Sequence, residues 1–182
     1  MKNEFTSNIC IECSNKFGSC CDNHPFVPLT ISDIKKIKSK GLKLKDFVKA
    51  EKYSKKDIIG PEKWWLDSFI YIGKKPYRLM IKKNKNGKCI FLKDKKGCTL
   101  KNCRPIFCKM YPFWIHPKNK KVIFDKSQIN ECYLAKKNNK LSKKIKMIQE
   151  NQKKLKSYYL KIKKDCISNK KIHKKLILQL IK

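Results

Sequence analysis

Ten cysteines in 182 residues constrain this chain more than any other feature of its sequence. The N-terminal stretch has no apolar run of the length that a secretory signal needs, and no run of about 18 apolar residues could span a membrane. We therefore expect a cytoplasmic protein without a transmembrane segment. In a reducing compartment, so many thiols indicate metal ligands rather than disulfides. The cysteines are Cys10, Cys13, Cys20, Cys21, Cys89, Cys98, Cys103, Cys108, Cys132 and Cys166.

The first four cysteines lie close together in the chain. Cys10 and Cys13 form a C-x2-C pair, a spacing that lets two thiolates bind one ion from a tight turn. Cys20 and Cys21 are adjacent, and adjacent side chains in extended backbone point to opposite sides. These two thiols can therefore serve two sites, or one can bind metal while the other packs. Because the chain has only three histidines, sulfur must dominate its metal sites, which indicates zinc or an iron–sulfur cluster.

Several common functional motifs are absent from the sequence. It has no C-x2-C-x2-C-x3-C ferredoxin run, no C-x3-C-x2-C run and no second C-x2-C pair of the kind a zinc ribbon needs. Its six glycines form no G-x-G, which argues against the usual dinucleotide-binding loop. No base–nucleophile arrangement stands out either. These absences disfavour several enzyme classes and leave cysteine-based metal binding as the main hypothesis.

The charge of the chain is strongly positive, with 47 Lys and Arg against 14 Asp and Glu. All but two of the basic residues are lysines, and the two arginines are Arg78 and Arg104. Base readout and bidentate phosphate contacts depend mainly on arginine. Lysines spread along the whole chain therefore indicate a solvated surface, with weak, non-specific and salt-sensitive attraction to polyanions.

Local patterns predict short helices and strands. Thr30 or Ser32 can cap a helix that ends near Gly41, and residues 44–58 have a weak helical pattern. Residues 77–83 and 88–92 flank an Asn-Gly dipeptide and predict a β-hairpin. Proline on both sides of Cys108 limits any helix there to a short turn, and residues 121–125 predict a strand.

The composition changes at Leu134, after which the chain holds 17 lysines and only two acidic residues. Apolar residues recur every seven positions from Leu134 to Ile162, which predicts one amphipathic helix. We expect this helix to pack on the cysteine domain, with a partner helix, a membrane surface or RNA as alternatives. The sequence thus predicts an α+β fold: a small cysteine-rich metal-binding domain at residues 1–133, and a basic α-helical C-terminal extension at residues 134–182.

The order of these motifs resembles the YkgJ-type cysteine-cluster family, a zinc- or iron-chelating domain that is related to flagellin lysine-N-methylase. The resemblance covers about residues 8–132 and departs from the family in the six residues between Cys13 and Cys20, where three are usual. The matching segments are Cys10-x2-Cys13, Cys20-Cys21, PFVPLTISDI at 25–34, CIFL at 89–92, GCTL at 97–100 and RPIFCKMYPF at 104–113.

The resemblance implies a set of metal ligands. Eight thiols exceed one tetrahedral site, so two sites, or one cluster with spare thiols, are both open. Arg104 is a candidate to support Cys103 and Cys108 by bonding backbone carbonyls or thiolates, because an arginine in so lysine-rich a chain indicates a geometric demand. An ordinary salt bridge is the alternative for this residue. Cys103 occupies a place that the family does not usually give to cysteine, so whether it is a ligand stays open. The implied ligands are Cys10, Cys13, Cys20, Cys21, Cys89, Cys98 and Cys108, to which we add Cys132 for its position after the 121–125 strand.

The main functional hypothesis is a protein that holds zinc or an iron–sulfur cluster through clustered cysteine thiolates, in a structural or a redox role. A metal-dependent protein-lysine methyltransferase is an alternative that the resemblance implies. A basic RNA-associated module that uses the C-terminal helix is the third hypothesis. The sequence leaves open whether the protein is an enzyme and whether it has a protein partner.

Overall fold

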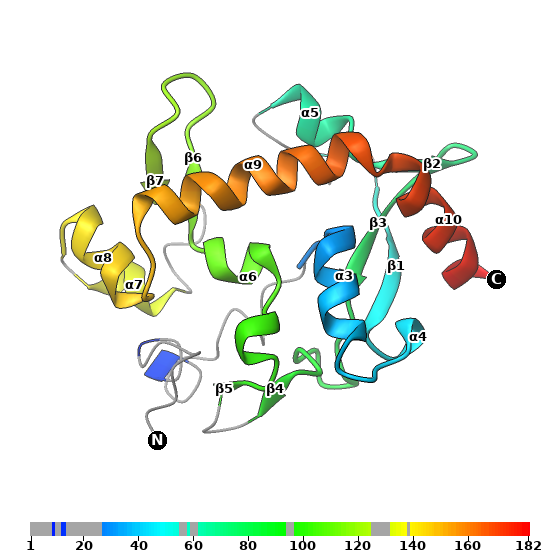
Figure 1. Cartoon of the computed structure of the whole chain (residues 1–182), viewed down its shortest axis with the longest axis horizontal. Helices are drawn as coiled ribbons and strands as arrows, with labels where there is room; N and C mark the ends of the chain where they lie inside the picture. Colours follow the sequence, from blue (N-terminus) through cyan, green and yellow to red (C-terminus); the bar gives the residue numbers. More distant parts are fainter. Residues whose placement is uncertain are drawn as a thin grey trace.

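The computed structural model describes residues 9, 12–13, 27–54, 58, 62–93, 97–124, 132–137 and 139–182. Small antiparallel sheets and helices make up this part of the chain, so the predicted α+β class is confirmed (Figure 1). The helices are α3 (Ile31–Lys38), α4 (Leu44–Phe47), α5 (Lys63–Leu66), the 3₁₀ turn η2 (Lys101–Cys103), α6 (Ile106–Met110), α7 (Tyr133–Lys136), α8 (Leu141–Met147), α9 (Gln152–Ser168) and α10 (Lys170–Ile181). The strands are β1 (Val48–Lys52), β2 (Ile70–Ile72), β3 (Lys75–Ile81), β4 (Leu92–Lys93), β5 (Gly97–Cys98), β6 (Phe113–Ile115) and β7 (Val122–Phe124).

The largest sheet has the strand order β1-β3-β2, with both pairs antiparallel. Its central strand β3 pairs Ile81 with Val48 of β1 and Tyr77 with Ile70 of β2. Gly73 lies in the tight turn between β2 and β3 with a φ of +58°, a conformation that glycine adopts without steric cost. Two further two-stranded sheets, β4-β5 and β6-β7, complete the described strands, and β7 confirms the strand predicted at 121–125.

The helix predicted after Thr30 is confirmed as α3. The hydroxyl of Thr30 accepts a hydrogen bond from the Asp33 amide at 3.0 Å, and the Asp33 carboxylate accepts one from the Thr30 amide at 3.1 Å. This reciprocal cap satisfies two amides at the start of the helix. The helix ends at Ser39, two residues before Gly41, whose φ is +84°.

The prediction of a weak helix at residues 44–58 is wrong for most of the residues that the structure describes there. Only Leu44–Phe47 is helical, and Val48–Lys52 forms β1. Phe47 and Val48 are fully buried where the chain changes from helix to strand. Pairing with β3 and burial against the sheet therefore outweigh a weak local helical preference.

The predicted turn between the two runs 77–83 and 88–92 forms, but the second strand is shorter than predicted. The side-chain oxygen of Asn84 accepts hydrogen bonds from the amides of Asn86 and Lys88, both at 3.0 Å. Lys83 and Cys89 then make a single antiparallel bridge. Only Leu92 of the run 88–92 belongs to a strand, β4, which pairs with β5 instead of β3.

In its described residues, 132–137 and 139–182, the C-terminal region forms four helices instead of the one helix predicted. The chain turns at Gln149, which has a φ of +61°, and Asn151 caps α9 by accepting a hydrogen bond from the Lys154 amide at 2.9 Å. Leu155 and Ile162 are fully buried, so these members of the predicted apolar stripe do face a core. In Figure 1, α9 lies across α6. Helix α10 then changes direction and packs on the three-stranded sheet. No helix among the described residues has the length and hydrophobicity that a membrane span requires.

Two clusters of buried side chains hold these elements together. The α9 core joins α9 to α5, α6 and the β6–β7 hairpin, and the sheet core joins α3 and α10 to the three-stranded sheet. The C-terminal helices thus contribute to both clusters. The α9 core comprises Ile9, Trp64, Ile106, Met110, Phe113, Ile115, Val122, Leu134, Ile145, Leu155, Tyr159 and Ile162. The sheet core comprises Leu29, Ile31, Ile34, Ile37, Phe47, Val48, Ile70, Leu79, Ile81, Phe91, Leu100 and Ile177.

Arg78 on β3 is buried between two aromatic rings. Its guanidinium carbon lies 3.6 Å from the centre of the Trp65 ring and 3.8 Å from that of Phe69. The same group donates hydrogen bonds to the Trp65 carbonyl, at 2.6 Å, and to the Ser68 hydroxyl. Burial lowers the pKa of Arg78 to about 10. A planar cation is needed here, because a lysine ammonium cannot stack on rings and reach both acceptors at once.

We expect Arg78→Lys to lower the free energy of unfolding by about 1–3 kcal/mol, because the substitution removes the stacking and one of the two hydrogen bonds. Urea denaturation followed by circular dichroism measures this change. Lys175→Arg, at an exposed position of α10, is the control and should leave the midpoint unchanged. An Arg78→Lys variant with the wild-type midpoint would contradict the assignment.

Candidate metal centre

The described residues include five of the eight candidate ligands, and each is half-buried. The other three, Cys10, Cys20 and Cys21, lie outside the described residues. Half-burial leaves a thiol sheltered from bulk solvent yet accessible to an ion. The five described candidates are Cys13, Cys89, Cys98, Cys108 and Cys132.

Cys89 and Cys98 belong to one small substructure around β4 and β5. The Leu92 amide donates a hydrogen bond to the Cys89 carbonyl at 3.0 Å, which closes a tight turn. Leu92 is in turn the strand partner of Cys98. Both cysteines pack against the sheet core. The turn and the strand pairing thus bring together two cysteines that are nine positions apart in the chain.

Cys108 lies on the short helix α6, whose orientation is fixed from both sides. Ile106 and Met110 are buried in the α9 core. Residues two apart on a helix do not face the same way, so Cys108 points away from these two anchors. The amide of Ile106 donates a hydrogen bond to the buried Asp33 carboxylate on α3 at 3.2 Å. The start of the helix that carries Cys108 is therefore bonded to α3.

Cations gather around α6. The guanidinium of Arg104 donates a hydrogen bond to the Cys108 carbonyl at 2.6 Å, and the ammonium of Lys109 donates one to the Asn102 carbonyl at 2.9 Å. Burial lowers the pKa of Lys109, and repulsion from Lys36 and Arg104 lowers it further. Positive charge near a thiol favours its thiolate form. The expected bond from Arg104 to a carbonyl near Cys108 is thus present.

Cys13 and Cys132 are on neighbouring segments. Cys132 precedes α7 and packs against the α9 core, in which Ile9 of the N-terminal segment is also buried. The pKa of Lys137, at the end of α7, is raised by Tyr133 first and to a smaller degree by the negative charge of Glu12. Figure 1 shows the N-terminal segment, in blue, beside α7. The chain thus brings together two segments, each with a candidate cysteine, that are more than a hundred positions apart in sequence.

The candidate thiols fit a zinc or iron site by their chemistry, since thiolate sulfur suits both metals. Within the described ranges, however, no three histidine, cysteine, aspartate or glutamate side chains lie close enough together to hold an ion. The described cysteines therefore do not make a complete site by themselves.

Two cysteines outside the ligand set have other surroundings. The thiol of Cys103 lies 3.5 Å from the side-chain oxygen of Asn102, and its side chain packs against the sheet core. Cys166 on α9 packs against the α9 core. Burial raises the pKa of Cys166 to about 11, although the nearby Arg78 opposes this shift. Cys166 is therefore a neutral, half-buried thiol that packs against a core, as a structural cysteine should.

Comparison with protein families identifies the class of the chain. Residues 9–175 match the CxxCxxCC family, described as "Putative zinc- or iron-chelating domain". The chain belongs to this family. The match continues through α9 into α10, well beyond residue 132, where the resemblance expected from the motifs ends. No curated protein and no solved structure matches the chain.

We expect the folded protein to be alkylated at Cys166 by iodoacetamide at least about tenfold more slowly than the urea-unfolded chain at pH 8, because the raised pKa and burial together suppress the reactive thiolate. Peptide mass spectrometry measures the rate at each cysteine. Cys103, whose side chain is also half-buried, is the internal control and should be slowed less than Cys166. Equal slowing at both positions would contradict a special environment for Cys166.

Proposed function

We propose that this chelating domain holds zinc or an iron–sulfur cluster through the thiolates of its clustered cysteines, and that the bound metal fastens the fold. The proposed ligands are Cys13, Cys89, Cys98, Cys108 and Cys132 together with Cys10, Cys20 and Cys21. Eight thiols are enough for two tetrahedral sites or for one cluster with spare ligands.

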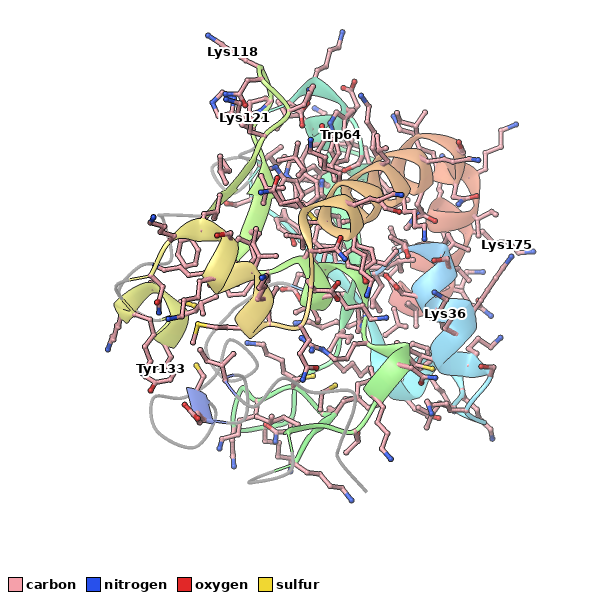
Figure 2. All side chains as sticks on the ribbon, turned by 60° about the vertical axis from the view of Figure 1, so that its left-hand side comes forward. Lys36, Trp64, Lys118, Lys121, Tyr133 and Lys175 are labelled. Atoms are coloured by element: carbon pink, nitrogen blue, oxygen red, sulfur yellow. The ribbon has the colours of Figure 1, made fainter. Side chains whose placement is uncertain are left out.

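The observation that carries the proposal is the gathering of the candidate segments at one end of the molecule. The N-terminal segment, the β4–β5 pair and α7 lie there in both views (Figures 1 and 2). Each of these segments carries or adjoins a candidate cysteine, and α6 with Cys108 lies next to them. A site assembled at this end would draw on segments that are far apart in the sequence.

The small size of these segments favours a structural role for the metal. β4 and β5 have two residues each, and α7 has four. Elements this short are not stable by themselves and depend on packing or cross-links to keep their positions. Metal–thiolate bonds supply such links, and in small metal domains the free energy of metal binding is part of the free energy of folding.

The local charge also supports thiolate ligands. Four thiolates around one Zn²⁺ leave a net charge of −2, which nearby cations stabilise. Arg104, Lys109 and Lys36 are grouped around the helix of Cys108 and can provide this compensation. The methyltransferase and RNA hypotheses, like the cytoplasmic location, stay predictions from the sequence.

We expect anaerobically purified full-length protein to contain zinc, or iron with acid-labile sulfide, and the single variants Cys13→Ser, Cys98→Ser and Cys108→Ser each to retain roughly half of the wild-type metal or less. Elemental analysis and a sulfide assay on the same samples measure this. Cys103→Ser and Cys166→Ala are the matched controls and should keep the wild-type content. Wild-type metal content in all three ligand variants would refute the proposal.

A second prediction concerns the support of the ligands by Arg104. Arg104→Lys keeps the positive charge but loses the guanidinium that bonds the Cys108 carbonyl. We expect metal transfer to an excess of a chelator to become roughly tenfold faster. A colorimetric chelator follows the transfer, with Lys101→Arg as the control. An unchanged rate in Arg104→Lys would show that this hydrogen bond does not hold Cys108 in its place.

A further inference from the structure

A pocket of about 660 Å³ lies on the molecule between α5, the turn of the β6–β7 hairpin and the junction of α9 with α10. Its walls bring four lysines together: Lys63 from α5, Lys118 from the turn, Lys163 from α9 and Lys170 from α10. We propose that this pocket binds an organic phosphate group, independently of the cysteine site.

The walls of the pocket are joined by one carboxylate. Glu62, which precedes α5, accepts a hydrogen bond from the Tyr159 hydroxyl on α9 and one from the Lys120 ammonium in the β6–β7 turn, the latter at 3.1 Å. Burial raises the pKa of Glu62, but the hydrogen bonds from Tyr159 and Lys120 outweigh burial and lower the pKa overall. An ionised carboxylate thus connects α5, α9 and the β6–β7 turn. The hydrogen bonds of Glu62 therefore hold the walls of the pocket in place.

The turn that carries Lys118 has a defined shape. The ring nitrogen Nδ1 of His116 accepts hydrogen bonds from the amides of Lys118, at 3.3 Å, and Asn119, at 3.4 Å. The amide of His116 donates to the Lys121 carbonyl at 2.9 Å, and the His116 carbonyl accepts from the Lys120 amide at 3.0 Å. These bonds hold the turn at the edge of the pocket, where Figure 2 shows Lys118 and Trp64 in the same part of the molecule.

The charges of the pocket favour an anion with several negative oxygens. Its lining contains four lysines against two acidic residues, Glu62 and Asp67. Glu62 is already paired with Lys120, which is not part of the lining. Among the described residues, no ion pair within 4.0 Å involves any of the four lysines. Several lysines lining one cavity can turn their flexible side chains toward a phosphate, whose oxygens can accept from more than one cation.

Apolar side chains next to these cations favour a phosphate that carries an organic group. Trp64 is buried in the wall, and Ile167 of α9 lines the pocket with half of its surface exposed. A phosphate group near the lysines would leave its organic part beside Ile167, where apolar contact adds to the charge attraction. The phosphate can come from a soluble ester or from a phospholipid headgroup, and the two sources are separable by experiment.

The proposal must be distinguished from the general attraction of a protein with a net charge of +33 for any anion. We would measure binding of the full-length protein to adenosine triphosphate by calorimetry, and to phosphatidylcholine vesicles with and without phosphatidic acid by co-sedimentation, at about 0.15 M ionic strength. The pocket variant is Lys118→Gln/Lys163→Gln. The control Lys40→Gln/Lys175→Gln removes the same charge from exposed positions outside the pocket.

We expect the pocket variant to bind one of the two probes about tenfold more weakly than the wild type, and the control to change by less than about twofold. Binding to adenosine triphosphate indicates a soluble ester, and binding only to vesicles that contain phosphatidic acid indicates a lipid headgroup. Equal weakening in both variants, or no binding of either probe to the wild type, would overturn the proposal. Circular dichroism melting of each variant verifies that the fold is intact.

Discussion

The N-terminus of α3 is held from two sides by buried carboxylates, and the arrangement of the other elements depends on this junction. Both oxygens of Asp165 on α9 accept from the Ile31 amide, at 3.0 and 3.1 Å, and one of them lies 2.8 Å from the His173 ring on α10. The Asp33 carboxylate accepts from the Thr30 amide in the cap of α3 and from the Ile106 amide at the start of α6. Amides at a helix start need such acceptors. The two carboxylates therefore join the sheet core to α6, α9 and α10.

Carboxylates are scarce in this chain, and several of them lie at joints between elements. Burial raises the pKa of Asp33, although hydrogen bonds from Thr30 and Ile106 oppose this. A buried carboxylate is costly, so its retention is explained by the geometry that it fixes. Glu62 has a similar function where α5, α9 and the β6–β7 turn meet. The lysines, in contrast, cover the surface, and their grouping in the pocket follows from how these joints place the elements.

Features set by local sequence were predictable, and features set by distant partners were not. The Thr30 cap and the buried face of α9 follow from neighbouring residues alone. Strand β1 depends on pairing with β3, and the end of the predicted long helix depends on a turn at Gln149 that no strong breaker marks. Candidate ligands were recognisable as cysteines, but the proximity of the Cys13 and Cys132 segments arises only in the fold. The functions of Glu62 and Asp165 were equally invisible, because their partners are distant in sequence.

The central claim is that thiolates from separate segments bind the metal of this chelating domain. X-ray absorption at the zinc or iron edge, recorded on anaerobically prepared full-length protein, measures the atoms around the metal directly. The account predicts a first shell made of sulfur alone, at about 2.3 Å in the case of zinc. A shell dominated by nitrogen or oxygen at about 2.0–2.2 Å would contradict it.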